Sequence, residues 1–467
     1  MNDDVLGRYE QANKFMQGVM TNKIARNDAV FSHWIENTHC FWYIKEAISG
    51  KEFRLVDAEA ASNALAFDHQ VLANLLAEAC EKEFNYQNLP LKNITMTLSP
   101  LRVRFQALGK HWLFDPDNAH CEELEVKKTQ QGLCSPDGKK TIFIREHNLW
   151  VGDCKTGEEQ ALTQDGTKDY CYDRAQWLMA GASLQGLWSS DSTRFFAFQS
   201  DSRKVTSRPS IHYVPQDGSL HPQLQQTKLA YPGDEHLETY RLISVEVNSG
   251  RIQEADYGPV LATGYSIAGL FDVKPMGWWS PDNRCAFFID ASRGGKAVRV
   301  VEFDTDTGVT RVLFEEISDT FVKLAHSTLE FPLFLPLPES DELIWFSERS
   351  GWGHLYLYDL TTGQLKHPIT EGEWLVRDLL HFDANQREIL VQTAARDPAI
   401  NPYYRDVCKI NIDSGLLTSL VAGNFDHHVC NNYNFAVATR NLFDIDNLTG
   451  VGISGVSPGG EFIVVTR

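Results

Sequence analysis

The sequence predicts an all-β fold, and within this class it favours a β-propeller made of repeated four-stranded sheets. Two observations carry the prediction. A turn of the Ser-Pro-Asp type, followed each time by a strand, recurs along the 467-residue chain. In addition, residues 343–369 place three short antiparallel strands in one compact stretch. Three such strands cannot bury both faces of a sheet by themselves, so the unit requires near-copies stacked beside it.

The clearest copy of the unit lies in the second half of the chain. Leu343–Ser347 is a β-prone apolar run, and Arg349-Ser-Gly351 provides a polar turn after it. Leu355–Tyr358 then forms an aromatic strand. Asp359–Gly363 turns the chain again, and Leu365–Ile369 begins a third strand.

Degenerate copies share the order of turn, strand, polar turn, aromatic strand and Thr-Gly or Ser-Gly turn. The opening turns begin at Ser135, Ser189, Ser280 and Ser457, and a related unit follows Asp383. Their spacing fits blades of roughly 40–60 residues with loop insertions. An irregular β-sandwich of similar strand density is the alternative that this spacing leaves open.

Two helices accompany the predicted sheets. An amphipathic pattern over residues 5–20 predicts a helix within an N-terminal segment, 1–22, and the propeller is expected to span 23–467. Asp68 can cap a second helix, inserted in the first blade, that runs as far as Glu83. The longest interruption of the repeats, 205–250, is expected to contain a hairpin.

Charge and cysteine content narrow the range of functions. The 43 basic and 62 acidic side chains give a net charge of −19, which argues against nucleic acid or an anionic membrane as a partner. Nine cysteines without a paired spacing indicate reduced thiols, and therefore the cytoplasm. The start has no apolar signal region, and no run reaches membrane-spanning length. A periplasmic location is the alternative if a signal sequence has been removed.

One match to a hydrolase motif is rejected on mechanism. Gly455-Val-Ser457-Pro-Gly459 fits the Gly-x-Ser-x-Gly nucleophile elbow. In that elbow the residue after the serine donates its backbone N–H to the oxyanion, and Pro458 has none. Too few residues follow Ser457 to supply the Asp and His that come next in this class. The motif is therefore expected to be a blade turn, and no residue of the chain is assigned a catalytic role.

Metal and cofactor signals are weak. His427-His428 with Cys430 has no matching second cluster at metal-ligand spacing. Asp304–Gly308 resembles the start of a calcium loop but lacks its final glutamate, which favours a hairpin turn. We expect neither a metal nor a cofactor.

The stretch Ser347–Asp359, continued by Ile369–Trp374, resembles the signature of the dipeptidyl peptidase IV N-terminal region, which belongs to the prolyl oligopeptidase family of serine peptidases. Further motifs occur in the family's order: Leu187–Ser189, Tyr231–Gly233, Trp279–Asp282 and Asn401–Tyr404. The resemblance covers essentially the whole chain. It implies a propeller, with eight blades expected and seven as the alternative, that caps an α/β-hydrolase domain.

The resemblance also implies a function. In this family the propeller filters the access of peptide substrates and helps to hold them, while the Ser-Asp-His triad lies in the hydrolase domain. The chain is therefore expected to be a non-catalytic propeller separated from that domain. Its expected partners are peptides, the hydrolase domain and a second copy of itself. A free-standing propeller that serves as a protein-interaction scaffold is the alternative.

One departure from the family concerns the substrate. Dipeptidyl peptidases carry two glutamates in the segment before this Trp-Ser turn, and these carboxylates bind the free α-amine of the substrate. The corresponding segment, 169–181, has no such pair; Asp173 is its nearest acidic candidate, and Arg174 beside it would weaken amine binding. The substrate-facing candidates are Asp173, Trp177 and Arg203.

Overall fold

The structure, a computed structural model, describes residues 5–20, 27, 30–36, 38–125, 132–175, 182–215, 218–261, 276–324, 332–430 and 453–467. Short antiparallel strands make up most of this part of the chain. Two α-helices, α1 (Val5–Met20) and α2 (His69–Cys80), and two 3-10 helices, η1 (Tyr86–Asn88) and η2 (Pro338–Ser340), accompany them. The all-β prediction is confirmed, together with both expected helices. Among these residues no helix is long and apolar enough to cross a membrane.

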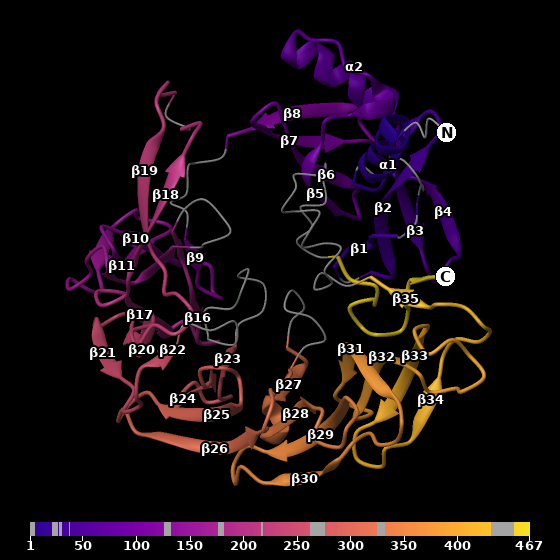
Figure 1. The fold of residues 1–467 in the computed structure, drawn as a ribbon. Helices are drawn as coiled ribbons and strands as arrows, with labels where there is room; N and C mark the ends of the chain where they lie inside the picture. The colour runs from indigo at the N-terminus through magenta and orange to yellow at the C-terminus, as the bar shows by residue number, and fades with distance from the viewer. Residues whose placement is uncertain are drawn as a thin grey trace.

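Seven sheets of four or more strands succeed one another along the described chain and are arranged as a ring, numbered here as blades 1 to 7 (Figure 1). Blade 1 contains β1 (His33–Trp34), β2 (Cys40–Ala47), β3 (Gly50–Asp57) and β4 (Ser62–Leu65). Blade 2 contains β5 (Lys92–Thr97), β6 (Arg102–Ala107), β7 (Lys110–Asp115) and β8 (His120–Leu124). Blade 3 contains β9 (Leu133–Cys134), β10 (Lys140–Arg145), β11 (Asn148–Asp153) and β12 (Glu159–Ala161).

Blade 4 is the largest sheet, with β13 (Tyr170–Cys171), β16 (Gly186–Trp188), β17 (Arg194–Asp201), β20 (Thr239–Glu246), β21 (Arg251–Glu254) and β22 (Val260–Leu261). Blade 5 contains β23 (Gly277–Trp279), β24 (Cys285–Ala291), β25 (Ala297–Asp304) and β26 (Thr310–Ile317). Blade 6 contains β27 (Phe334–Leu337), β28 (Glu342–Ser347), β29 (His354–Asp359) and β30 (Leu365–Pro368). Blade 7 contains β31 (Leu375–Asp383), β32 (Glu388–Ala394), β33 (Arg405–Asn411) and β34 (Leu417–Ser419).

Three two-stranded sheets complete the described strands: β14 (Asp173–Ala175) with β15 (Ala182–Leu184), β18 (Ser207–His212) with β19 (Gln223–Lys228), and β35 (His428–Val429) with β36 (Val465–Thr466). The β18–β19 pair is the hairpin expected in the longest interruption. The β35–β36 pair lies between blade 7 and blade 1, where Figure 1 shows the yellow C-terminal segment. The seven complete blades agree with the predicted range of seven or eight.

A shared hydrogen-bond pattern explains why the Ser-Pro-Asp-type turns recur. In each turn the serine hydroxyl accepts a hydrogen bond from the backbone N–H five residues later, at 2.9–3.0 Å, in turns that begin at Ser135, Ser189, Ser280 and Ser457. In the first three turns the hydroxyl also donates to the aspartate two residues on, at 2.6–2.7 Å. These local bonds satisfy the backbone where the chain reverses, so the motif can be recognised in the sequence.

The antiparallel pairing gives the ring two different faces. Turns that join the first strand to the second, and the third to the fourth, lie at the same end of every blade. We call this end the turn face. Turns between the second and third strands, and the segments that connect one blade to the next, lie at the other end, the connection face.

Hydrophobic clusters join neighbouring blades. Blades 1 and 2 share one cluster with α2, and separate clusters join blades 3 and 4, 4 and 5, 5 and 6, and 6 and 7. A smaller cluster joins blade 7 to the C-terminal segment. Their largest members, such as Trp112 and Trp345, are fully buried, and burying one large apolar side chain stabilises the fold by about 1.5–3 kcal/mol. Among the described residues, none of these clusters contains side chains from both blade 2 and blade 3.

Helix α2 connects the first two blades. Its N-cap is Asp68, as predicted, whose carboxylate accepts hydrogen bonds from the backbone N–H groups of Gln70 and Val71 at 2.8 and 3.1 Å. Leu72 and Leu76 on its apolar side are completely buried. The helix ends at Cys80, before the expected Glu83, because Glu81 adopts a left-handed conformation with φ of 51°.

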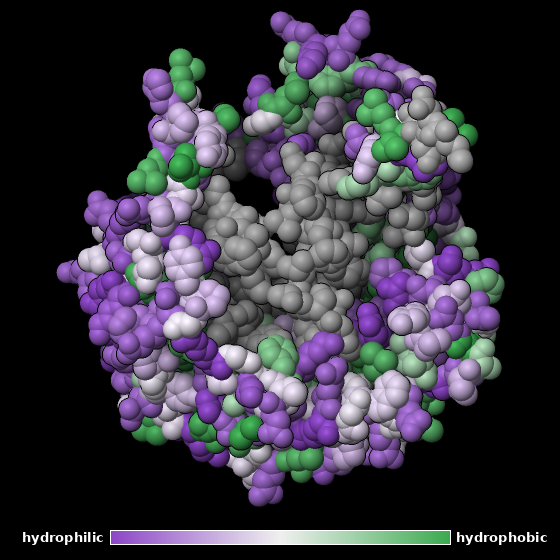
Figure 2. All heavy atoms as spheres, in the orientation of Figure 1, coloured by the Kyte–Doolittle hydropathy of each residue, from purple (hydrophilic) through white to green (hydrophobic). Residues whose placement is uncertain are grey.

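Blades 3, 5, 6 and 7 each have a glycine in the turn between the third and fourth strands, and the space around two of these glycines differs. A Cβ on Gly363 of blade 6 would lie 2.1 Å from the carbonyl oxygen of Leu313 in blade 5. In the same position of blade 3, a Cβ on Gly157 would meet nothing within 4 Å. The blade before it is blade 2, and no hydrophobic cluster of the described residues joins blades 2 and 3; we call this boundary the seam. Figure 2 shows the surface hollowed between the β18–β19 hairpin and blade 2.

The ring closes where blade 1 meets the C-terminal segment. His33 of β1 forms a bridge with Ile453, and the Ser32 hydroxyl donates to the Ser454 carbonyl oxygen at 2.6 Å. The Trp34 indole donates to the same oxygen at 2.9 Å. Burial lowers the pKa of His33 to about 4, so its ring is neutral at physiological pH. A few polar contacts of high sequence separation therefore hold the ends of the ring together.

Candidate functional site

Two of the three predicted substrate-facing residues lie at the connection-face end of blade 4. Asp173 begins β14, directly after β13, and Arg203 follows β17. Tyr170 of β13 pairs with Asp201 of β17 in antiparallel register. Asp173 and Arg203 therefore lie on opposite sides of this pair. Each has its own partner. The third candidate, Trp177, lies outside the described residues.

Asp173 is paired with a residue of the neighbouring blade. Its carboxylate side chain is 11% exposed, and Oδ1 lies 3.2 Å from Nδ1 of His147, whose side chain is 40% exposed. His147 occupies the turn between β10 and β11 of blade 3, in a left-handed conformation with φ of 66°. The pair thus joins blades 3 and 4 on the connection face and presents a partly exposed imidazole to the solvent.

Cys171 lies beside this pair but is not a nucleophile. Its thiol donates a hydrogen bond to the Asp173 carbonyl oxygen at 2.9 Å. Burial, together with the negative charge of Asp173, raises the pKa of Cys171 to about 12. The thiol therefore stays protonated at neutral pH, and the reactive thiolate does not form.

Arg203 is neutralised within its own strand end. Its Nε and one terminal nitrogen donate to the two carboxylate oxygens of Asp201 at 2.9 and 2.6 Å. This bidentate contact holds the pKa of Asp201 below its usual value. The guanidinium also stacks over the Tyr170 ring, 4.0 Å from its centroid. A ligand anion would have to compete with Asp201 for this cation.

A polar network beneath the site was not found by sequence reasoning. The Tyr172 hydroxyl donates to Asp165 at 2.8 Å, and the Gln199 amide donates to the other oxygen of the same carboxylate at 3.2 Å. Arg241 lies 3.4 Å from Asp165 and 3.2 Å from Glu254. Burial, and then the bond to Asp165, raise the pKa of Tyr172. The network holds the residue next to Asp173 in place, and no local motif connects members so distant in sequence.

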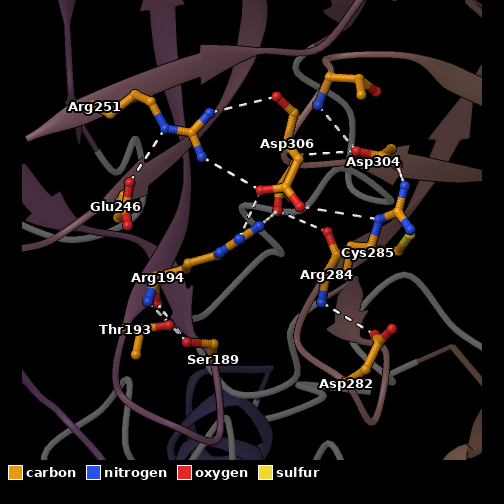
Figure 3. Close-up of polar contacts among 12 residues, drawn as sticks. Ser189, Thr193, Arg194, Glu246, Arg251, Asp282, Arg284, Cys285, Asp304 and Asp306 are labelled. Carbon is orange, nitrogen blue, oxygen red and sulfur yellow. Dashed lines mark hydrogen bonds and ion pairs between the residues drawn. The ribbon is translucent and has the colours of Figure 1, made fainter. Parts of the chain in front are cut away.

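The turn face carries a different cluster of charges, which ties blade 4 to blade 5 (Figure 3). Asp306 of blade 5 forms ion pairs with Arg194 and Arg251 of blade 4, at 2.7 and 3.3 Å. Arg251 also pairs with Glu246 at 3.2 Å, and Arg284 pairs with Asp304 at 2.7 Å. Because each arginine already faces a carboxylate, the cluster serves as an inter-blade contact. The turn predicted at Asp304–Gly308 is part of it, with Asp304 accepting bonds from its own loop at 3.0 Å.

The Gly-x-Ser-x-Gly match is a blade turn, as predicted. Ser457 is 1% exposed, and its hydroxyl accepts the Phe462 backbone N–H at 3.0 Å. The carboxylate of Glu461 lies 3.4 Å from the same hydroxyl. A nucleophile must instead be exposed and bonded to a general base. The fold and these sites define the chain as a β-propeller in which the serine motif has a structural role.

The chain matches a known protein family over most of its length. Residues 93–454 match the family described as the dipeptidyl peptidase IV (DPP IV) N-terminal region. This match covers most of the chain, which therefore belongs to that family. The resemblance inferred from the Ser347–Asp359 signature is confirmed.

Known relatives agree with this assignment. The probable dipeptidyl peptidase 4 of Aspergillus flavus is 24% identical over 267 residues, and dipeptidyl aminopeptidase A of Saccharomyces cerevisiae is 23% identical over 324 residues. These alignments cover 55% and 62% of this chain but 33% of each relative, so the chain spans about a third of the length of these curated relatives.

Solved structures show the same fold. Dipeptidyl peptidase 4 of Porphyromonas gingivalis aligns with a TM-score of 0.55 at 16% identity, over 90% of this chain and 56% of the other. A Bacteroides ovatus protein assigned as a dipeptidyl aminopeptidase IV aligns with a TM-score of 0.54 at 13% identity, over 86% and 55%. At this identity the likeness concerns the fold.

Proposed function

We propose that the chain is the non-catalytic propeller of a dipeptidyl-peptidase-like serine exopeptidase, and that it screens and orients peptides for an α/β-hydrolase domain. The observation that carries this proposal is a ring of blades in a chain that belongs to the dipeptidyl peptidase IV N-terminal region family. The chain also corresponds to about a third of relatives named as dipeptidyl peptidases. In this proposal the ring binds and selects peptides, and a separate hydrolase domain cleaves the peptide bond.

Two features support the role in selecting peptides. On the connection face, the Asp173–His147 pair offers a carboxylate to a substrate's α-ammonium group, whereas the charge of Arg203 is already matched by Asp201. At the side of the ring, the described residues of blades 2 and 3 share no hydrophobic cluster, and we infer that an extended peptide enters the ring at this boundary.

The test compares this chain with the complete natural protein on chromogenic X-Pro and X-Ala peptides. We expect the 467-residue chain to release no product. The complete protein should release it in a reaction that a serine-directed organophosphonate stops. Serine-dependent turnover by this chain alone would contradict the non-catalytic role. A natural reading frame that encodes no hydrolase domain would favour the interaction scaffold instead.

In the complete protein, the substitution Asp173→Asn should raise KM for peptides with a free N-terminus by about tenfold while kcat stays within about twofold. The reason is that the amide keeps the shape of the carboxylate but loses its attraction for the α-ammonium group. Steady-state kinetics on an X-Ala substrate measures both constants. Asp137→Asn, an aspartate in a turn-face loop of blade 3, is the matched control and should leave KM unchanged. An unchanged KM in D173N would remove Asp173 from the substrate site.

The proposal includes a second copy of the chain as a partner. The β18–β19 hairpin stands out from blade 4 (Figure 1), and its apolar residues are exposed: Tyr213 by 73%, Val214 by 88%, Leu220 by 94% and Leu224 by 67%. Exposed apolar clusters of this kind mark interaction sites. We expect light scattering to find a dimer that becomes monomeric when Leu220 and Leu224 are both replaced by serine. Ile48→Ser, at an equally exposed residue of blade 1, should remain dimeric; a wild-type monomer at all concentrations would contradict the proposal.

A further inference from the structure

A cavity of about 930 Å³ lies between blades 6 and 7. Its walls include β27 and β31, the first strands of these two blades, which lie on the inner side of the ring in Figure 1. Cavities that hold small molecules typically measure about 300–1,000 Å³ and are lined mainly by apolar side chains. The apolar part of this lining includes Leu335, Pro336, Leu379, Leu380, Phe382 and Ile389.

Two of the three arginines in the lining are already neutralised. Arg387 pairs with two carboxylates at 2.6 and 2.9 Å, and Arg405 pairs with Asp426 at 2.6 Å. His428 also lines the cavity, and burial, followed by the charge of Arg405, lowers its pKa to about 4. Its ring is therefore neutral at physiological pH. These three side chains offer no unmatched positive charge to a ligand.

The third arginine, Arg377, is half-buried and forms no hydrogen bond or ion pair within the part of the chain that the structure describes. It occupies a β-bulge of β31. The neighbours Val376 and Asp378 pair with residues of β32, and Arg377 between them has no partner in the register. Such bulges redirect a side chain and are common beside binding sites. The cavity thus contains one guanidinium that is available to an anion.

Two carboxylates in the lining limit the charge of that anion. Glu339 belongs to η2, and the Asp378 carboxylate, which accepts the Leu379 backbone N–H at 2.9 Å, adjoins Arg377 in the sequence. A dianion such as a phosphate monoester would face these negative charges with only one unmatched cation, which is unfavourable. A single carboxylate, by contrast, matches the planar fork of one guanidinium.

We propose that this cavity binds a small apolar molecule that carries one carboxylate, such as an aryl-substituted alkanoic acid. The carboxylate pairs with Arg377, and the apolar body packs on Leu379 and Phe382. The ligand needs no strand-type pairing with β31, where the Val376 N–H already donates to the Gly353 carbonyl oxygen at 2.8 Å. The inference goes beyond the proposed function, because the ligand is a small molecule and not the peptide substrate.

The test measures binding to this chain by isothermal titration calorimetry. The probes are naphthylacetate, its amide, naphthyl phosphate and acetate. We expect naphthylacetate to bind at least about tenfold more tightly than the amide or the phosphate, because only a monoanion matches one guanidinium. It should exceed acetate by at least as much, because acetate lacks the apolar body. A smaller preference over any of the three, or no binding of naphthylacetate, would overturn the proposal.

Variants locate the binding site. Arg377→Gln should bind naphthylacetate no more tightly than the amide, whereas Arg377→Lys should retain part of the preference, since lysine keeps the charge without the planar fork. Arg104→Gln, at an exposed arginine of blade 2, is the matched control and should bind as the wild type does. Thermal unfolding of R377Q at the wild-type temperature shows that the loss is local. An undiminished preference in R377Q would contradict the assignment. No step of the assay involves peptide cleavage, so its failure is distinguishable from a failure of the proposed function.

Discussion

Gly363→Ala should lower the free energy of unfolding by about 3–5 kcal/mol, among the largest effects of a single substitution in this chain. Gly363 has a φ of +75°, which costs an alanine about 1 kcal/mol. The larger cost is steric, since the new Cβ would lie 2.1 Å from the Leu313 carbonyl oxygen and 2.8 Å from its carbon. Relief requires blades 5 and 6 to separate, which exposes their shared core. Denaturant unfolding of the chain measures the loss.

Gly157→Ala is the matched control for this prediction. Gly157 occupies the same turn in blade 3 and has nearly the same φ, +77°, but a Cβ there would meet nothing within 4 Å. It should therefore cost only the conformational term of about 1 kcal/mol. Equal losses for G157A and G363A would show that blades 2 and 3 are packed as closely as blades 5 and 6, and the seam would not exist.

Glu342→Gln should also be strongly destabilising, by about 2–3 kcal/mol, because it removes the charge of a buried carboxylate that pairs with Lys366 and Arg387. Arg387 keeps its second partner, Asp413, at 2.6 Å. The Glu342 side chain is 5% exposed and is contacted by Lys366 of blade 6 and by Arg387 of blade 7, the latter at 2.9 Å. Burial alone would raise the pKa of Glu342, but hydrogen bonds from Lys366, Ser340 and Arg387 hold it below its ordinary value. The network therefore stabilises the contact between the two blades.

The sign of the pH dependence follows from that lowered pKa. The stabilisation is fully present above the pKa that Glu342 has in the unfolded chain, and it is lost as the pH falls through the lower folded value. The difference between wild type and E342Q, measured by denaturant unfolding, should therefore shrink in acid. Asp306→Asn in the exposed cluster of Figure 3 is the control and should cost much less, because solvent screens such pairs. A loss in E342Q no greater than in D306N would contradict the role of burial.

Local chemistry made much of the fold predictable. The turn serines, such as Ser135 and Ser280, form bonds within five residues, and Asp68 caps the helix that follows it directly. Such short-range contacts produce a recognisable sequence motif. The contacts that close the ring produce no motif, because Ser32 and Ser454 are 422 positions apart. The same holds for the seam, which depends on how blades pack and not on any one segment.

The candidate site was predictable to a smaller extent. Asp173 stood out because the segment that carries it lacks the glutamate pair of the family, but its partner His147 belongs to another blade. The ion pair between Asp201 and Arg203 could not be predicted from the sequence, because it depends on where β17 ends. The roles of Asp173, Trp177 and Arg203, and the cytoplasmic location, remain predictions.

The central claim, that the ring selects peptides while a serine elsewhere cleaves them, is tested most directly by labelling that serine. The complete natural protein is treated with a fluorophosphonate, which modifies only an activated serine, and the labelled peptide is mapped by mass spectrometry. We expect the modified serine to lie outside the 467 residues of this chain, and we expect the isolated chain to take up no label. A label on any serine within them, Ser457 included, would contradict it.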